Sequence, residues 1–222
     1  MDGMEIMERR HSVRQYEDCP LAEAAVEALA AEIAACNREG GLSIQLALEE
    51  PAAFTGLLAK YGSFRGVRNY LVLAGPKGPD LEERAGYYGE RLVLLAERLG
   101  LNTCWVGATY RKGKCRCTLG PGEKLVCVVA LGYGAVRGKP HKSKPLTAVC
   151  AGPEPWPEWF RRGGEAALLA PTALNQQKFR LTLEEGGAVR AVSTGGAYSK
   201  VDLGIVKYHF ELGAGGAAFA WR

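Results

Sequence analysis

The sequence predicts an α+β fold, and three patterns of apolar residues carry this prediction. Residues 26–33 and 81–99 repeat apolar side chains at helical spacing. Residues 124–131 are almost wholly apolar, as expected of a strand that is buried on both faces. Residues 179–183 and 189–193 alternate like strands and are joined through a Gly-Gly turn, which indicates a hairpin. Helices and strands therefore occur together in one chain.

The remaining elements follow from the breakers and caps that separate the apolar runs. In the first half we expect a helix over residues 4–9, a long helix entered at Asp18 and ended by Gly40-Gly41, a strand over 42–48, a short helix from Pro51 to Lys60, and a central strand over 70–74. In the second half we expect a helix over 80–99, a strand-like piece over 101–107, a helix over 159–169, a last helix capped by Asp202, and a final strand over 217–221.

Two glycines, Gly86 and Gly89, lie inside the helix expected over residues 80–99. Each costs about 1 kcal/mol relative to alanine in a helix interior. Such a cost is tolerated where another backbone or a flat ligand must approach closely. We expect packing to be the reason, with a flat ligand as the alternative.

The composition is that of an ordinary globular protein. Of 222 residues, 47% are hydrophobic and 23% charged, and a formal net charge of +4 is too small to indicate nucleic-acid binding by itself. Seven cysteines are scattered through apolar runs, the start does not resemble a signal peptide, and no run is apolar enough for a membrane span. We therefore expect a cytoplasmic protein without a membrane partner. Its main body should cover residues 1–150, and a C-terminal segment over 151–222 should complete the same fold.

The first segment with candidate chemistry spans residues 9–16, Arg-Arg-His-Ser-Val-Arg-Gln-Tyr. Its arginines supply forked donors suited to phosphate, and Ser12 adds a compact hydroxyl. If the chain is extended from Ser12 onward, Ser12 and Arg14 face the same side. A solvated basic patch is the alternative interpretation.

A second basic cluster follows the strand expected over residues 124–131. It contains Lys139, His141, Lys142 and Lys144 and is flanked by prolines. A solvated loop would explain this cluster by itself. Two basic clusters far apart in sequence could instead converge on one dianion.

The stretch over residues 170–179 is Ala-Pro-Thr-Ala-Leu-Asn-Gln-Gln-Lys-Phe. Pro171 ends the preceding helix, because its ring removes a donor and clashes with the turn before it. Thr172, Asn175 and Gln177 then offer a hydroxyl and two amides. An amide presents both a donor and an acceptor, which suits the edge of a flat heterocycle. Alternatively, these side chains hydrogen-bond only their own turn.

Other chemistries find less support. Cys115-Arg116-Cys117 has a single intervening residue, too few for a usual zinc knuckle, so we expect no metal site. No Gly-x-Gly-x-x-Gly follows an expected strand, so the sequence does not support a dinucleotide-binding fingerprint. A Cys–His nucleophilic pair stays open, although no cysteine stands in a recognisable nucleophile context. A nucleic-acid-binding module is not favoured, because repeated surface aromatics and a recognisable binding helix are missing.

Taken together, these segments resemble the FMN-dependent nitroreductase superfamily. Residues 9–16 resemble its opening Arg-x-Ser-x-Arg/Lys segment, and residues 89–107 resemble its central helix and the loop beside the flavin ring. Gly132-Tyr133-Gly134 with residues 142–146 resembles its late basic segment, and residues 170–177 resemble its Ala-Pro-Ser-x-x-Asn-x-Gln-Pro-Trp motif. The order departs from the usual one, because the Asn-Gln motif lies late and Lys178-Phe179 replaces Pro-Trp. This arrangement resembles a rearranged branch of nitroreductases.

The resemblance implies a three-layer nitroreductase-like fold with a central, mostly antiparallel sheet flanked by helices. It implies FMN as the cofactor, bound by Arg10, His11, Ser12, Arg14, Val106, Gly107, Lys142, Lys144, Pro171, Thr172, Asn175 and Gln177. Within this set, Arg10, Ser12, Lys142 and Lys144 would hold the phosphate. Arg14 would lie beside the flavin N1 and C2 carbonyl, Asn175 and Gln177 would contact the pyrimidine edge or the substrate, and backbone amides near Val106 would approach N5. No catalytic acid or base is implied, because the flavin carries the chemistry.

The implied activity is NAD(P)H-dependent reduction of nitro, quinone or similar electron-poor aromatic compounds. A non-catalytic flavin-binding or flavin-sensing protein is the alternative. Typical members are intertwined homodimers with the flavin at the subunit interface. A rearranged chain could instead complete the site from within itself, so a monomer and a homodimer both stay open.

Overall fold

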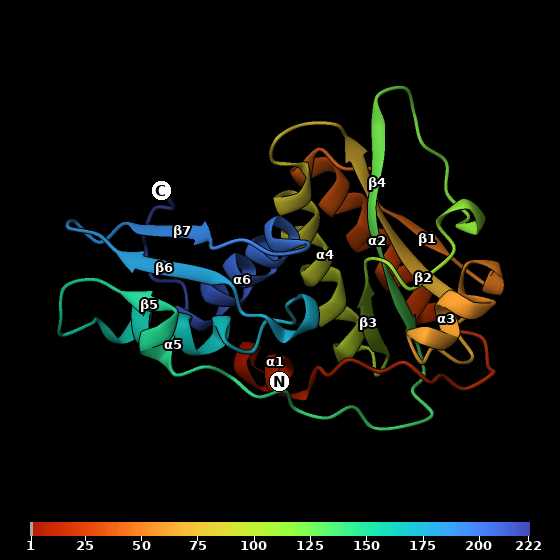
Figure 1. Ribbon diagram of the computed structural model, residues 1–222, viewed down its shortest axis with the longest axis horizontal. Coiled ribbons are helices and arrows are strands. Elements are labelled where there is room, and N and C mark those ends of the chain that lie inside the picture. Colours follow the sequence, from red (N-terminus) through yellow and green to blue (C-terminus); the bar gives the residue numbers. More distant parts are fainter. Residues whose placement is uncertain (1) are drawn as a thin grey trace. The chain divides into compact units, whose positions relative to one another are not determined.

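The computed structural model describes residues 2–222 and confirms the α+β class. The chain divides into two compact units, each built from discontinuous segments. One, the sheet unit, contains Arg9–Leu81 and Arg91–Lys139. The other, the C-terminal unit, contains the residues up to Glu8 together with Glu82–Glu90 and Pro140–Arg222. Figure 1 labels the main helices and strands of both.

The sheet unit is built around a four-stranded antiparallel sheet. Its strands are β1 (Gln45–Ala47), β2 (Asn69–Pro76), β3 (Asn102–Val106) and β4 (Glu123–Gly132), in the order β1-β2-β4-β3. The two inner strands, β2 and β4, are the ones whose sequences are most continuously apolar. Their residues are buried over nearly their whole length. The central strand expected near residues 70–74 is therefore confirmed, and the strand expected over 42–48 is shorter than predicted.

Both faces of this sheet are covered, which explains why β4 does not alternate between polar and apolar residues. Tyr70 and Val128 belong to a buried cluster on one face. Their neighbours Leu71 and Val129 point to the opposite face, because side chains alternate along a strand, and they too are fully buried. A strand in such a position has no polar face to show in its sequence.

Helix α2 (Glu23–Gly40) begins later than predicted. Ala22 occupies the N-cap position, and Asp18 instead forms an ion pair with Arg68. The helix ends as expected, since Gly41 adopts a left-handed φ of 56° and its N–H donates to the carbonyl of Asn37. The short helix predicted from Pro51 to Lys60 is divided into η1 (Pro51–Phe54) and α3 (Leu57–Tyr61), with Gly56 at φ 88° between them.

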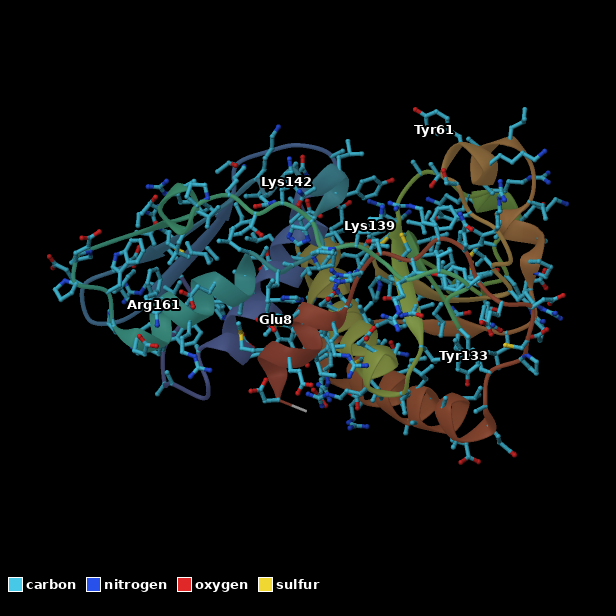
Figure 2. All side chains as sticks on the ribbon, turned by 90° about the horizontal axis from the view of Figure 1, so that it is seen from below. Glu8, Tyr61, Tyr133, Lys139, Lys142 and Arg161 are labelled. Carbon is cyan, nitrogen blue, oxygen red and sulfur yellow. The ribbon has the colours of Figure 1, made fainter. Side chains whose placement is uncertain are left out.

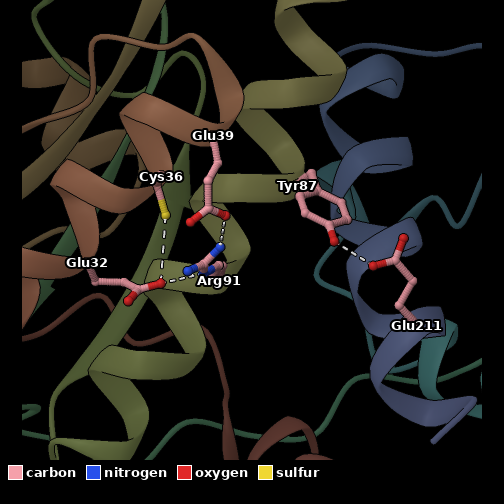
Figure 3. A network of polar contacts seen from close by, with 6 residues as sticks. All are labelled: Glu32, Cys36, Glu39, Tyr87, Arg91 and Glu211. Carbon is pink, nitrogen blue, oxygen red and sulfur yellow. Dashed lines mark hydrogen bonds and ion pairs between the residues drawn. The ribbon is translucent and has the colours of Figure 1, made fainter. Parts of the chain in front are cut away.

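Helix α4 (Leu81–Arg98) contributes residues to both units. In the sheet unit, its Arg91 pairs with two carboxylates of α2, those of Glu32 and Glu39 (Figure 3). In the C-terminal unit, its Tyr87 donates a hydrogen bond to Glu211 (Figure 3). Burial raises the pKa of Tyr87 above its usual range, so the hydroxyl stays protonated and remains a donor.

The C-terminal unit combines helices with a small sheet. Its elements are α1 (Gly3–Arg9, whose last residue belongs to the sheet unit), α5 (Glu158–Ala167), α6 (Ser199–Gly213) and the strands β5 (Cys150–Ala151), β6 (Phe179–Leu183) and β7 (Val189–Ser193). Strand β6 pairs with β5 in parallel and with β7 in antiparallel fashion, which confirms the predicted hairpin. The final strand predicted over residues 217–221 is reduced to one bridge between Val189 and Trp221. Single-turn 3-10 helices complete the chain at η2 (Lys112–Lys114), η3 (Leu146–Ala148) and η4 (Ala173–Asn175).

Helices α4 and α6 meet at two glycines, Gly86 and Gly204. A Cβ at Gly86 would lie 2.0 Å from the carbonyl oxygen of Val201, and a Cβ at Gly204 would lie 1.9 Å from that of Glu83. Each glycine therefore faces backbone of the other helix. Close packing, the reason predicted for Gly86, is confirmed.

The observed units do not coincide with the expected division after residue 150. The C-terminal unit begins at Pro140 and also takes in α1 and the first half of α4. Within residues 2–222, no helix is long and apolar enough to cross a membrane.

Candidate functional site

The candidate residues of the first basic segment lie on an extended stretch of the sheet unit. Val13 donates its N–H to the carbonyl of Thr103 on β3 at 2.9 Å. Further along, Tyr16 donates its N–H to Arg65 at 3.0 Å, and Arg65 returns a bond to the carbonyl of Arg14 at 2.9 Å. Backbone bonds to separate parts of the unit thus hold this stretch in place.

Side chains over residues 12–14 alternate as predicted for an extended chain. Val13 and Tyr16 are buried in the core of the sheet unit, whereas Ser12 and Arg14 are exposed. The Tyr16 hydroxyl donates to the carbonyl of Val13 at 2.6 Å, which holds the segment from its buried side. Ser12 and Arg14 therefore present a hydroxyl and a guanidinium on one side, as the sequence predicts.

Arg14 is oriented by an aromatic ring. Its guanidinium carbon lies 6.0 Å from the centroid of Phe64, within the range of a cation–π contact. Phe64 lies three residues after the end of α3 and donates its N–H to the carbonyl of Ala59 at 2.9 Å. Phe64 could not be predicted from the sequence as a partner of Arg14, because an aromatic residue after a short helix has no local feature that links it to an arginine far earlier in the chain.

Arg10 differs from its neighbours in being buried, with only 3% of its surface exposed. It lies near Glu97, whose pKa is raised by burial and lowered again by the charges of Arg9 and Arg10. It also acts on Cys104, whose pKa burial raises while Arg14, a hydrogen bond from Ser12 and Arg10 oppose the rise. Arg10 and Arg14 thus both act on the middle of β3, at Cys104.

The other candidates of the sheet unit lie around the same segment. Val106 is the buried last residue of β3, and half-buried Gly107 follows it. His11 is half-buried, and a Cβ on Gly138 would lie 2.3 Å from the Cβ of His11. The chain after β4 therefore passes directly over His11.

The remaining candidates lie in the C-terminal unit, where Gln177 is the best connected. This side chain is buried, with 3% exposed. Its Oε1 accepts the N–H of Lys144 at 2.8 Å, and its Nε2 donates to the carbonyl of Lys142 and to Asn175 Oδ1, both at 2.7 Å. Asn175 adds a bond from its Nδ2 to the same Lys142 carbonyl at 2.8 Å. The amide motif therefore holds the basic loop.

The basic loop holds the amide motif in return. Lys144 Nζ donates to the carbonyls of Gln176 and Gln177 at 2.9 and 2.8 Å. His141 Nε2 lies 2.9 Å from the carbonyl of Leu168, an obligate acceptor, so this nitrogen carries the proton. Lys142, labelled in Figure 2, is exposed.

The backbone of the amide motif is strained. Leu174, Asn175 and Gln177 all adopt left-handed conformations, with φ of 52°, 51° and 45°. Asparagine tolerates this region, but a residue such as leucine rarely does, and Leu174 is 96% exposed, so burial does not compensate. Strain of this kind persists only where the surroundings enforce it, and it is concentrated at functional sites.

Asp202 enforces the turn from α6. It was predicted to cap that helix, and this is wrong: Tyr198 occupies the N-cap position and Asp202 lies in the first turn. The Asp202 carboxylate instead accepts the N–H of Ala173 at 2.9 Å and Gln176 Nε2 at 2.7 Å. Burial raises its pKa to about 6, against the opposing effect of these two bonds.

Thr172 completes the turn, since its Oγ1 accepts the N–H of Gln177 at 3.0 Å, and half-buried Pro171 precedes it. The structure thus gathers the candidates into two groups. Arg10, His11, Ser12, Arg14, Val106 and Gly107 lie in the sheet unit, and Lys142, Lys144, Pro171, Thr172, Asn175 and Gln177 lie in the C-terminal unit. Their roles as cofactor contacts stay predictions.

A family model and several solved structures are similar to this chain, and all of them are described as nitroreductases. A family model described as "Putative TM nitroreductase" matches residues 2–214. A solved "putative nitroreductase" from Thermotoga maritima MSB8 is 23% identical, with a TM-score of 0.68 over 96% of this chain and 83% of that one. A "Putative NADH dehydrogenase/NAD(P)H nitroreductase" from Bacteroides thetaiotaomicron VPI-5482 is 17% identical, with a TM-score of 0.53 over 66% of this chain and 95% of that one.

A third structure, a "putative nitroreductase in complex with FMN" from Desulfovibrio desulfuricans, is 20% identical, with a TM-score of 0.52 over 66% of this chain and 93% of that one. No curated protein matches the sequence. At these identities the structural likeness shows the fold, and the family model, which spans nearly the whole chain, shows the family. Nitroreductases are oxidoreductases, which gives the general class of the chain. The resemblance predicted from the sequence is confirmed: the chain belongs to this nitroreductase family.

Proposed function

We propose that the chain is an FMN-dependent oxidoreductase that takes electrons from NADH or NADPH and reduces nitro, quinone or similar electron-poor aromatic compounds. Family membership supports an oxidoreductase. A related structure described as a complex with FMN supports the cofactor, and another whose description names NAD(P)H supports the donor.

The observation that carries the proposal is the exposed pair of Ser12 and Arg14, fixed beside β3. A phosphate dianion or a reduced flavin needs charge-assisted donors that are already in place. Ser12 and Arg14 meet this requirement, because their backbone is bonded to β3 and to Arg65. The contact with Phe64 further limits the directions open to the Arg14 guanidinium. Ser12 and Arg14 are therefore suited to bind the phosphate or the ring of FMN.

When bound, FMN supplies the redox chemistry, and the chain supplies binding, orientation and charge. Arg14 is proposed to stabilise the negative charge that a flavin gains around N1 on reduction. Ser12 and Arg10 are proposed to stabilise the negatively charged phosphate of FMN. In the C-terminal unit, the bonds that Gln177 and Lys144 make support a positioning role for them. Exposed Asn175 is proposed, from the family resemblance, as a contact of the flavin edge.

Titration of the purified protein with FMN, followed by quenching of flavin fluorescence, tests the proposal. Arg14→Gln should raise the FMN dissociation constant about 10- to 100-fold, since a hydrogen bond to a charged group is worth about 1.5–3 kcal/mol. Arg38→Gln is the matched control, because Arg38 is an exposed arginine on α2. Unchanged affinity in Arg14→Gln, or equal loss in both variants, would contradict the assignment.

Asn175→Ala tests the amide motif separately. FMN retention should fall or the flavin reduction potential should shift, while circular dichroism shows an intact fold. If affinity and potential both stay unchanged, the motif serves only to hold its own turn and the basic loop.

A further inference from the structure

The proposed flavin chemistry makes no use of the most unusual segment of the sheet unit, residues 111–117. Its sequence, Arg-Lys-Gly-Lys-Cys-Arg-Cys, places four cations and two thiols in seven positions. The cations are exposed, and both cysteines are free and partly buried. We call these residues the basic dithiol segment.

The two thiols are arranged as a pair. Cys115 has extended backbone, with φ −69° and ψ 124°, and in extended chain residues two apart project to the same side. The Cys115 and Cys117 side chains are in hydrogen-bond contact, and both pack against the buried core of the sheet unit. A disulfide needs Cβ atoms about 3.5–4.5 Å apart, so the backbone between the two thiols in contact must bend before their sulfurs can join.

Tyr70 on β2 holds the inner thiol. Its hydroxyl oxygen accepts the N–H of Arg116 at 2.8 Å, which leaves its proton for a hydrogen bond to Cys115. Burial raises the pKa of Cys115 to about 12, although Tyr70 and Lys112 oppose the rise. Cys115 is therefore a protonated thiol at neutral pH and can donate to Cys117.

Cys117 is the thiol that a ligand can reach. It lines a cavity of about 320 Å³ between residues 45–48 along strand β1 and residues 116–118. The Gln45 side chain fixes the width of this cavity, because its amide bonds to both the N–H and the carbonyl of Thr118, at 2.9 and 2.6 Å. The cavity is thus a formed space with Cys117 and Arg116 in its wall, and the Arg116 guanidinium lies 3.9 Å from the carboxylate of Glu50.

We propose that Cys115 and Cys117 are a redox-active pair that exchanges with small, negatively charged disulfides entering this cavity. The Cys117 thiolate attacks one sulfur of the small disulfide, the S–S bond breaks, and a small thiolate leaves and takes up the proton that Cys117 gave up. Cys115 then loses its proton to the second small thiolate as its sulfur attacks that of Cys117. The products are a Cys115–Cys117 disulfide and two small thiols, so two electrons pass from the chain to the small disulfide. The surrounding cations favour an anionic partner.

The test uses the reduced full-length protein and oxidised glutathione as the probe. After incubation, the protein is denatured, its free thiols are alkylated, and the modified cysteines are mapped by mass spectrometry. We expect an internal disulfide linking Cys115 to Cys117 before any other cysteine is lost. Cys115→Ser should trap a glutathione adduct on Cys117, and Cys117→Ser should give neither adduct nor disulfide. The control is Cys19→Ser, which removes a partly buried cysteine outside the segment and should behave like the wild type.

The variants' melting temperatures establish that each is folded. No link between Cys115 and Cys117, or an adduct on Cys115 in the Cys117→Ser chain, overturns the proposal. Cystamine, a positively charged disulfide, tests the charge preference. At low salt, glutathione disulfide should react with the chain about tenfold faster than cystamine, or more. Added salt should reduce this difference between the two rates. Equal rates at low salt overturn the anionic assignment. The readout is the chain's own thiols, so these results do not depend on flavin binding.

Discussion

Replacing Gly86 by alanine tests the packing of the C-terminal unit, where α4 and α6 meet backbone to backbone. The new Cβ would lie 2.0 Å from the Val201 carbonyl oxygen, whereas real Cβ contacts stay beyond 3.0 Å. The two helices must therefore separate by about 1 Å, and no side-chain rotation can relieve the contact.

The expected magnitude follows from two opposing effects. Overpacking costs typically 1–3 kcal/mol, and a contact between two backbones belongs in the upper part of that range. Exchanging glycine for alanine inside a helix stabilises by about 1 kcal/mol. The net loss is then about 1–2 kcal/mol, which for a chain of this size lowers the melting temperature by roughly 2–8 °C.

Thermal and urea unfolding of Gly86→Ala, Gly204→Ala and the double variant measures this loss. The double variant should lose less than the sum of the single losses, because helices already separated by one methyl group accommodate the second more easily. Gly113→Ala is the control, since a Cβ there meets no atom within 4 Å. A Gly86→Ala chain more stable than the wild type, as helix propensity alone predicts, would refute the reasoning.

Three further predictions concern polar groups of the C-terminal unit. Asp202→Asn should remove a pH dependence of the free energy of unfolding. Burial raises the pKa of Asp202 in the folded chain to about 6 from 3.8, so its contribution to stability is full below pH 3.8 and is lost as the pH rises through 6. Between pH 7 and pH 5, urea unfolding should therefore show the wild type gaining about 1 kcal/mol over the variant. His209→Leu should lower the free energy of unfolding by about 3–5 kcal/mol, because the fully buried carboxylate of Glu90, 2.9 Å from His209 Nε2, loses its ring partner. The double variant with Glu90→Met should recover much of that loss. Gln177→Ala removes three hydrogen bonds, and amide exchange of Lys144 should speed up relative to the wild type.

Each of these has an outcome that contradicts it. For Asp202→Asn it is a stability difference that stays the same at pH 5 and pH 7. For the buried pair it is a double variant no more stable than His209→Leu. For Gln177→Ala it is unaltered protection of the Lys144 amide.

The sheet could be predicted because its signals are local. A run such as residues 124–131 is apolar throughout because both faces of β4 are covered, and Gly86 pointed correctly to close packing because glycine in a helix interior needs a reason. The extended segment was predictable for the same cause, since Ser12 and Arg14 alternate with buried Val13.

Asp202 shows where local signals stop. An acidic residue before an apolar run is typical of a helix cap, yet its carboxylate bonds to Ala173, 29 residues earlier. Leu174 in a left-handed conformation is equally hard to predict from the sequence, because no propensity favours it and bonds from Asp202, Thr172 and Lys144 hold the motif around it. The two units could not be anticipated either, since α4 contributes to both and its sequence reads as one continuous helix.

The most direct test of the central claim is the absorbance spectrum of the purified protein, first with added FMN and then after anaerobic addition of NADH or NADPH. We predict that the chain retains FMN, that the yellow oxidised-flavin band is bleached by a nicotinamide donor, and that a quinone or nitroaromatic compound restores it. A protein that takes up no FMN would contradict the claim at its base, and bound FMN that neither donor bleaches would contradict the proposed activity.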